Sequence, residues 1–276
     1  MASADSVFAG AVPEMYTRYM GPMLFQPYAD YLAGCIAGWA GSTILETACG
    51  TGIVTRALCR SSSRTVAITA TDLNQPMLDH ARTLPGGERV RWQQADAQAL
   101  PFPDASFDVV VSAFGVMFFP DKVGAYREAL RMLRPGGRFI FTVWDGIETI
   151  ELQNIAHTAV AALYPRDPPS FLSRIPCGYH DVTMIRADLL QAGVHDASIE
   201  TLERPSRSAS ARDAAIGFVR GTPLSAEISI RDPAGLDRAV EAVTEAIAAR
   251  FGDASIEARM QAHVVTVQRK LAAVGG

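Results

Sequence analysis

Residues 44–54 read ILETACGTGIV, and this stretch decides which fold the sequence predicts. An apolar run ends near one acidic residue, Glu46, and is followed by Gly50 and Gly52. Apolar residues then return at helical spacing in 53–58. The stretch therefore predicts a buried strand, a loop whose glycines let a ligand approach the backbone, and a helix with free N–H groups at its start.

Apolar runs of strand length recur through the first half of the chain and alternate with amphipathic runs of helix length. Such alternation predicts a parallel sheet with helices on both faces. The strand runs are TILETA (43–48), TVAITATD (65–72), VRWQQA (90–95), FDVVVSAF (107–114) and RFIFTVW (138–144). The helical runs between them are IVTRALCR, QPMLDHARTL and KVGAYREALRML. Pro135 is expected to end the last of these helices, and Gly136 and Gly137 to form the turn before the next strand.

The rest of the chain has a looser pattern. Helices are predicted at 150–164, 182–194, 209–220 and 233–251, and strands at 197–206 and 262–270. We therefore expect helices between the last two strands of the sheet. Two more helices are expected within 12–40, around Pro13 and Pro27.

Composition limits the classes of protein that need to be considered. The chain has 276 residues, of which 49% are hydrophobic, and a formal net charge of -4. This length suits one large domain or one domain with an insertion, and the acidic balance disfavours nucleic acid as a partner. The start does not resemble a signal peptide, and no apolar run has the length of a bilayer span. We expect a cytoplasmic protein without stable membrane attachment, with reduced cysteines and no metal site.

The acid before the loop restricts the ligand. Ligands of open parallel sheets bind beyond the carboxyl ends of the strands, where the loop after Glu46 is expected. A dinucleotide-binding loop would have a third small residue at the position of Thr55, and an acid would repel its pyrophosphate. An acid attracts an ammonium or sulfonium group instead, so the residues favour a cationic ligand without phosphates. S-adenosylmethionine meets this description, and an NAD-dependent oxidoreductase is the alternative.

The motif E-x-x-C-G-T-G at 46–52 resembles the first motif of class I S-adenosylmethionine-dependent methyltransferases. Further segments follow in the family's order: ITATDLN, QQADAQALPFPDASFDVV, SAFGVMFFPD and LRPGGRFIFTVW. The resemblance covers roughly residues 40–145 and points to the subgroup of ubiquinone/menaquinone-biosynthesis methyltransferases. It implies an α/β, Rossmann-like doubly wound fold. The seven-stranded sheet would be mostly parallel with its last strand antiparallel, and a helical cap would be added.

The resemblance also implies roles for single residues. An acid at the position of Asp72 takes both ribose hydroxyls, because a carboxylate accepts two hydrogen bonds side by side. Asp96 would accept from the adenine amino group, and the backbone N–H of Ala97 would serve a ring nitrogen. The expected cofactor contacts are Tyr16, Phe25, Glu46, Ala48, Cys49, Gly50, Thr51, Gly52, Asp72, Leu73, Met77, Asp96, Ala97, Gln98, Ala113 and Phe114. The expected substrate pocket consists of Tyr19, Met117, Phe118, Trp144, His157 and Tyr179.

Ordinary structural roles stay open for several of these residues. Glu46 could instead cap the helix after the loop, since acids favour helix N-termini. Asp72 and Asp96 could form turns at strand ends. Tyr16 could pack within an N-terminal helix instead of meeting the methionine end of the cofactor. His157, taken alone, is compatible with a packing or surface role. No His/Asp pair marks a general base, so no catalytic residue is named.

The expected organisation has three parts. Residues 1–40 would form an N-terminal helical lid, and 41–145 the cofactor-binding core. Residues 146–276 would complete the sheet and carry a helical substrate cap, roughly at 146–195 and 209–252. The expected reaction moves a methyl group to an N, O or C atom of a small molecule by in-line displacement. A non-catalytic cofactor-binding module is the second alternative, and the protein is expected to be a monomer or homodimer.

Overall fold

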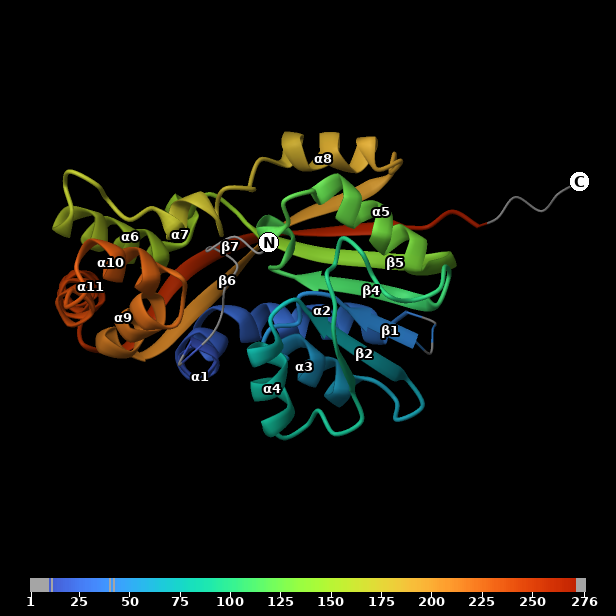
Figure 1. Ribbon diagram of the computed structural model, residues 1–276, viewed down its shortest axis with the longest axis horizontal. Helices are drawn as coiled ribbons and strands as arrows, with labels where there is room; N and C mark the ends of the chain where they lie inside the picture. Colours follow the sequence, from blue (N-terminus) through green and yellow to red (C-terminus); the bar gives the residue numbers. More distant parts are fainter. Residues whose placement is uncertain (1–9, 11, 40, 42, 272–276) are drawn as a thin grey trace, which may run out of the picture. The chain divides into compact units, whose positions relative to one another are not determined.

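A seven-stranded mixed sheet organises the chain, with the strand order β3-β2-β1-β4-β5-β7-β6 and an antiparallel β7 (Figure 1). The structure is a computed structural model that describes residues 10, 12–39, 41 and 43–271. The strands are β1 (Thr43–Glu46), β2 (Ala67–Asp72), β3 (Arg91–Gln94), β4 (Phe107–Ala113), β5 (Leu133–Trp144), β6 (Ala197–Ser210) and β7 (Ala254–Gln268). The predicted fold class is confirmed.

The first five strands form the parallel part of the sheet. β1 lies between β2 and β4, and Glu46 is in register with Ala70 on one side and Val111 on the other. β3 pairs with β2, where Asp72 is in register with Gln94, and β5 pairs with β4. All four pairings are parallel, so the carboxyl ends of β1, β2 and β4 meet at one edge of the sheet.

β7 runs antiparallel to β5. The backbone N–H of Gly136 donates to the carbonyl of Arg269 at 2.9 Å, and further along β5 the N–H of Asp145 donates to the carbonyl of Gln261 at 3.2 Å. Residue numbers therefore rise along β5 while they fall along β7. Three helices lie in the chain between β6 and β7, namely α9 (Ala211–Arg220), α10 (Leu224–Arg231) and α11 (Leu236–Phe251). This confirms the prediction of helices between the last two strands.

The chain divides into two compact units. The helical unit comprises Met1–Tyr28, Trp144–Tyr179 and Leu202–Ala262, and the sheet unit comprises Ala29–Val143, His180–Thr201 and His263–Gly276. The sheet unit contains α3 (Ile53–Ser61), α4 (Gln75–Thr83), the 3-10 helix η3 (Val116–Phe118), α5 (Lys122–Met132) and α8 (Val182–Gln191). The helical unit contains α1 (Val12–Met15), the π-helix η2 (Tyr16–Phe25), the 3-10 helix η4 (Ile147–Thr149), α6 (Glu151–Leu163), α7 (Phe171–Arg174) and α9 to α11. α2 (Gln26–Ala37), β5, β6 and β7 contribute residues to both units.

The sheet unit is built by amphipathic helices on a nearly continuous apolar sheet. α3 buries Ile53, Val54, Ala57 and Leu58 on one face, while Arg60 lies on the exposed face. Figure 1 shows α8 beside α5, which packs against β4, while α3 and α4 lie against β2 and α4 also contacts β3. These helices hold the strands and therefore fix the loops that leave the carboxyl ends.

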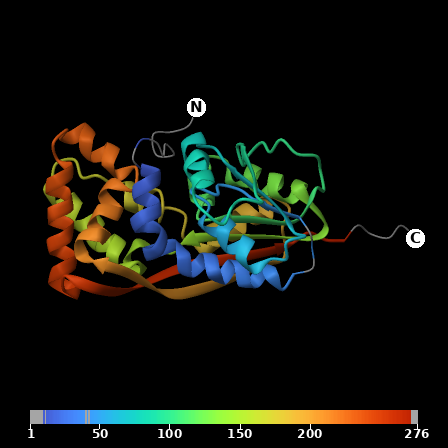
Figure 2. The same ribbon diagram turned by 90° about the horizontal axis from the view of Figure 1, so that it is seen from below.

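Helices α6, α9 and α11 lie side by side in the helical unit, as Figures 1 and 2 show. Gly217 of α9 lets η2 approach closely, because a Cβ at this position would lie 3.1 Å from both the Met20 sulfur and the Tyr19 Cβ. The two helices predicted around Pro13 and Pro27 are α1 and α2, and η2 joins them without a loop. Pro22 lies inside η2, and a wider turn accommodates a residue that lacks a backbone N–H.

The segment 133–137 differs from its prediction. α5 ends at Met132, and β5 starts at Leu133, so Pro135 and the two glycines after it belong to the strand. Phe107 pairs with Leu133, but Val109 pairs with Arg138, so the extra residues on β5 form a bulge. A bulge tolerates proline because the ladder is already interrupted there.

Candidate functional site

The loop after β1 has an unusual backbone. Ala48, Gly50 and Gly52 all have a left-handed conformation, with φ of 51°, 55° and 77°. The N–H of Cys49 donates to the carbonyl of Thr71 at 2.9 Å, which ties the loop to β2. A non-glycine residue with positive φ is uncommon and marks a constrained position. The predicted loop is therefore a rigid bend attached to a neighbouring strand.

Of the two loop glycines, Gly52 tolerates a side chain less well than Gly50. A Cβ on Gly52 would lie 2.6 Å from Cη2 of Trp92 on β3, whereas one on Gly50 would meet only the Cε of Met77, at 3.4 Å. Gly52 also precedes α3, and no side chain caps that helix end. The first N–H groups of α3 are consequently available to a ligand or water.

Glu46 is buried at the end of β1, with 1% of its surface exposed. Its Oε2 accepts a hydrogen bond of 2.5 Å from the hydroxyl of Thr55. Burial raises the pKa of Glu46 from 4.5 to about 8, although the Thr55 hydrogen bond and the charge of Arg56 act to lower it. The carboxyl therefore meets a side chain of α3 and no backbone N–H among the described residues, which disagrees with the alternative that Glu46 caps this helix.

Asp72 is the second buried acid, at the end of β2. Its Oδ2 accepts from the backbone N–H of Gly50 at 2.8 Å, and its Oδ1 accepts from the backbone N–H of Asn74 at 2.8 Å. Burial raises the pKa of Asp72, and these hydrogen bonds oppose the rise. The Asn74 contact is a turn of the kind that the structural alternative predicted, while the Gly50 contact links the acid to the loop. A carboxylate has further acceptor capacity beyond these bonds.

Asp96 and Gln98 form a small turn after β3. Oδ1 of Asp96 accepts from the backbone N–H of Gln98 at 2.9 Å and from its side-chain nitrogen at 3.2 Å. Oε1 of Gln98 accepts from the N–H of Asp121 at 2.8 Å, just before α5. Gln98 therefore positions the turn against α5. Asp96 is half-buried, and a turn-forming role for it is present in the structure.

The end of β4 is strained beside the loop. Phe114 has a φ of 53°, which is rare for a bulky residue, and its N–H donates to the carbonyl of Thr142 at 3.0 Å. A Cβ on Gly115 would lie 2.5 Å from the Cβ of Ala48, so the segments after β1 and β4 touch there. Strained backbone of this kind clusters at functional sites.

The two units share the predicted site residues unevenly. The sheet unit holds fourteen predicted cofactor contacts, from Glu46 to Phe114, and two predicted substrate residues, Met117 and Phe118. Leu73 is 42% exposed directly after Asp72. The helical unit holds the other predicted residues, Tyr16, Tyr19, Phe25, Trp144, His157 and Tyr179. Their contacts with cofactor or substrate stay predictions.

Aromatic side chains of the helical unit form a row. Tyr16 stacks on Phe25 with ring centroids 5.0 Å apart, and Phe25 lies 5.7 Å from Trp144. Trp144 meets the edge of Tyr28 at 5.5 Å, and the Tyr28 hydroxyl donates to the carbonyl of Leu202 at 3.0 Å. The packing alternative for Tyr16 is thus present in the structure. Among the polar candidates, Tyr179 is buried, and burial lowers the pKa of His157.

The buried polar groups at the ends of β1 and β2 suit a cationic nucleoside. Two buried carboxyls with raised pKa values, Glu46 and Asp72, lie at adjacent strand ends, and burial of such groups is costly unless a cation or donor meets them. The hydroxyl of Thr51 in the loop is buried and has no hydrogen-bond partner among the described residues. Acceptors of this kind suit hydroxyl, amino and sulfonium groups and oppose a pyrophosphate. The residues fit S-adenosylmethionine.

Sequence reasoning missed several contributors. The sequence marks Thr55 only as a residue too large for a dinucleotide-binding loop, whereas in the structure its hydroxyl donates a hydrogen bond to Glu46. Asn74, Trp92 and Gly115 were not singled out. Gly115 could have been found from the sequence, because a glycine at the end of a strand run often marks a close approach of another backbone segment. The sequence has no comparable signal for Trp92, which depends on the pairing of β3 with β2.

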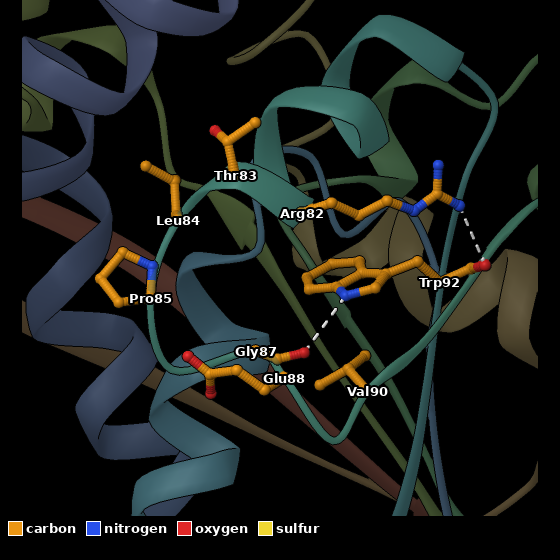
Figure 3. A pocket seen from close by; sticks show the side chains of 8 residues that line it. All are labelled: Arg82, Thr83, Leu84, Pro85, Gly87, Glu88, Val90 and Trp92. Atoms are coloured by element: carbon orange, nitrogen blue, oxygen red, sulfur yellow. Dashed lines mark hydrogen bonds between the residues drawn. The ribbon is translucent and has the colours of Figure 1, made fainter.

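A separate pocket of about 390 Å³ lies on the segment from α4 to β3 (Figure 3). Its lining residues are Arg82, Thr83, Leu84, Pro85, Gly87, Glu88, Val90 and Trp92. The Trp92 nitrogen donates to the carbonyl of Gly87 at 3.3 Å, and Arg82 donates to the carbonyl of Trp92 at 3.1 Å. No predicted site residue lines this pocket.

Known proteins match the part of the chain that carries the loop. Residues 45–141 match the family described as methyltransferase domain. A ubiquinone/menaquinone biosynthesis C-methyltransferase from Hahella chejuensis is 41% identical over 105 residues, which are 37% of this chain and 42% of that protein. An uncharacterized protein from Mycobacterium tuberculosis is 34% identical over 127 residues, 45% of each chain. The chain thus spans less than half the length of these relatives.

Solved structures match over most of the chain. The YcgJ protein from Bacillus subtilis superposes with a TM-score of 0.57 and 19% identity over 89% of this chain and 100% of that one. A putative methyltransferase from Bacillus halodurans gives 0.56 and 18% over 87% and 98%. At such identities the likeness shows the fold alone. Among the described residues, no helix is both long and apolar enough to span a bilayer.

Proposed function

We propose that the whole protein transfers a methyl group from S-adenosylmethionine to a small molecule, since residues 45–141 match the methyltransferase-domain family. S-adenosylmethionine is the methyl donor typical of this family. The observation that carries the proposal is the pair of buried acids, Glu46 and Asp72, beside a left-handed loop. The hydrogen bond from Gly50 to Asp72 makes the loop and the second acid one unit.

The proposed cofactor roles follow the chemistry of each group. Glu46 supplies negative charge for the cationic end of the nucleoside. Asp72 accepts from the ribose hydroxyls with the capacity left beside its contacts to Gly50 and Asn74. Asp96 accepts from the adenine amino group, and the backbone N–H of Ala97 serves a ring nitrogen. Leu73 and Met77 supply apolar surface, and the exposure of Leu73 beside Asp72 supports this role.

The chemistry asks little of the protein beyond placement. S-adenosylmethionine, when bound, supplies a methyl group activated by its sulfonium charge. An anionic acceptor becomes neutral when it is methylated, whereas a neutral acceptor takes up the positive charge and then releases a proton to water where it carries one. In both cases the transition state has more dispersed charge than the reactants, and apolar and aromatic side chains such as Phe114 and Met117 favour it by excluding water. Alignment of the acceptor with the methyl group lowers the activation barrier by about 7–11 kcal/mol in well-oriented systems. No general base is assigned.

The proposed acceptor is a small aromatic or aliphatic molecule that reacts at N, O or C. The aromatic row from Tyr16 to Trp144 supports an acceptor with a planar or apolar body. His157 and Tyr179 are the proposed polar contacts, and Tyr19, Phe118 and Trp144 the proposed apolar ones. The name of the Hahella relative adds quinols to the acceptors worth testing.

The test is transfer of a labelled methyl group from S-adenosylmethionine to a panel of phenols, quinols, amines and lipids. We expect turnover with at least one acceptor and loss of turnover in Asp72→Ala. Asp79→Ala is the matched control, because Asp79 lies on the exposed face of α4 and pairs with Arg82. Binding of the nucleoside without turnover on any acceptor would favour the non-catalytic module. Absence of binding would refute the proposal.

A further inference from the structure

Thr55 lies in the first turn of α3, fully buried, with its hydroxyl 2.5 Å from Oε2 of Glu46. We propose that Thr55 is a positioning residue for the methyl donor: its hydroxyl holds the Glu46 carboxylate in the orientation that the cationic nucleoside needs. The inference rests on the proposed function and assigns a specific task to a residue outside the cofactor contacts.

The two carboxylate oxygens of Glu46 have different surroundings. Oε2 is occupied by Thr55, while Oε1 accepts no hydrogen bond among the described residues. A threonine side chain in a helix has few rotamers, so its hydroxyl is a fixed donor. Glu46 ends β1 and Thr55 belongs to α3, so this one bond spans the loop that carries Gly50 and Gly52. A fixed Oε2 leaves Oε1 as the oxygen available to a cation.

Charged and titratable groups surround Glu46 on several sides. Arg56 of α3 lowers the pKa of Glu46, and its guanidinium also donates to the carbonyl of Thr51 at 2.6 Å. Asp72 of β2 raises it. Cys49 in the loop and Cys59 of α3 also lie within electrostatic reach of Glu46. Burial outweighs these influences and keeps the carboxyl largely neutral at pH 7 without a ligand.

A cation favours the ionised carboxylate, so binding of the donor near neutral pH should release a proton from Glu46. The Thr55 hydrogen bond stabilises the ionised form, because charge-assisted hydrogen bonds are stronger than neutral ones. Without the hydroxyl, the pKa of Glu46 rises further, and donor binding then needs a higher pH. A purely structural role for Thr55 predicts no such change in pH dependence.

The test compares wild type with Thr55→Val, which removes the hydroxyl at nearly constant shape, and with Thr55→Ser, which keeps it. Affinity for S-adenosylmethionine is measured by titration calorimetry between pH 6 and pH 9. In wild type we expect affinity to rise with pH and to level off near pH 8. In Thr55→Val we expect about tenfold weaker binding of S-adenosylmethionine at pH 7, as loss of a hydrogen bond to a charged group implies. The midpoint of the rise in affinity with pH should also lie at a higher pH than in wild type. Thr55→Ser should behave like wild type.

Thermal melts without ligand show whether each variant folds, and Thr55→Ala replaces Thr55→Val if the latter does not. A folded Thr55→Val with the wild-type pH midpoint, or a Thr55→Ser as impaired as Thr55→Val, would overturn the role of Thr55. Such results would leave the proposed function intact. Failure of wild type to bind the nucleoside at every pH would overturn both.

Discussion

The backbone N–H of Gly50 donates a hydrogen bond of 2.8 Å to Oδ2 of Asp72, which joins the glycine loop after β1 to the acid at the end of β2. The two motifs lie 22 residues apart in the chain. One carboxylate thus stabilises the left-handed loop and stays an acceptor for the ligand. Any change at Asp72 should therefore alter both the loop and the binding of the nucleoside.

Asp72→Asn should lower the stability of the protein and weaken its binding of the nucleoside. An amide has one acceptor oxygen, so its NH2 group would face the N–H of either Gly50 or Asn74 and leave a buried donor unpaired. We expect about 1–3 kcal/mol less stability and at least about tenfold weaker binding of S-adenosylmethionine. Urea unfolding and titration calorimetry measure the two effects. Asp79→Asn, whose ion pair with Arg82 is exposed, should change stability by less than about 1 kcal/mol. Equal effects of the two variants would disprove this assignment.

Glu46→Gln should have opposite effects on stability and on ligand binding: it should stabilise the protein relative to wild type as pH rises, and it should weaken the binding of S-adenosylmethionine. The folded-state pKa of Glu46 is about 8, above its ordinary value of 4.5, so the folded protein holds a proton that the unfolded chain lacks between these values. The free energy of unfolding therefore falls as pH rises through this window, by up to about 1.4 kcal/mol per pH unit from this group. Glutamine does not titrate, so the free energy of unfolding of Glu46→Gln should increase relative to that of wild type as the pH rises from 5 to 8.

Calorimetric melts of both proteins at pH 5, 6.5 and 8 measure this difference. The melting temperature of Glu46→Gln relative to wild type should increase with pH, while its affinity for S-adenosylmethionine at pH 8 falls at least about tenfold, because the neutral amide cannot attract the cation. A difference in melting temperature that does not change with pH would show that Glu46 titrates normally.

Gly115→Ala should strain the contact between the loops after β1 and β4. The added Cβ would lie 2.5 Å from the Cβ of Ala48. We expect a loss of about 1–3 kcal/mol in stability, as is typical of overpacking. Ala48→Gly removes the opposing Cβ and relieves a φ of 51°, so the double variant should recover most of the loss. A double-mutant cycle by urea unfolding measures the coupling, and additive effects would contradict the contact.

Gly52→Ala should lower stability and weaken nucleoside binding, whereas Gly34→Ala should do neither. The first variant places a Cβ 2.6 Å from Trp92 at a φ of 77°, whereas Gly34 is an exposed residue of α2 where an added Cβ would meet nothing within 4 Å. We expect Gly52→Ala to cost about 1–3 kcal/mol and to weaken nucleoside binding. Gly34→Ala should stabilise α2 by about 0.5–1 kcal/mol and leave binding unchanged. Similar stabilities of the two variants would refute the role of Gly52.

Much of the sheet unit could be predicted because local rules decide it. The run before Glu46 is apolar, the glycines come where the bend is needed, and the strand runs alternate with helical runs. The pattern of the chain also predicts the helices before β7, whereas the antiparallel direction of β7 is implied only by the resemblance to the methyltransferase family. The pairs Glu46–Thr55 and Gly50–Asp72 could not be derived, since they depend on where α3 and β2 come to lie once the sheet has formed.

Other features escaped prediction for identifiable reasons. Pro135 reads as a helix stop, yet the register of β4 with β5 places it in a bulge, and a single sequence does not reveal register. The π-helix η2 packs against α9 near Gly217, a contact between segments far apart in the chain that a single sequence does not reveal. Burial gives Glu46 its raised pKa, so the sequence predicted the acid without its protonation state.

The decisive measurement is a pair of calorimetric titrations of the folded wild-type protein at pH 8, one with S-adenosylmethionine and one with NAD. The buried acids Glu46 and Asp72 predict saturable binding of the sulfonium nucleoside and no detectable heat with NAD. Tight binding of NAD with none of S-adenosylmethionine would contradict the proposed methyl transfer and the roles given to both acids.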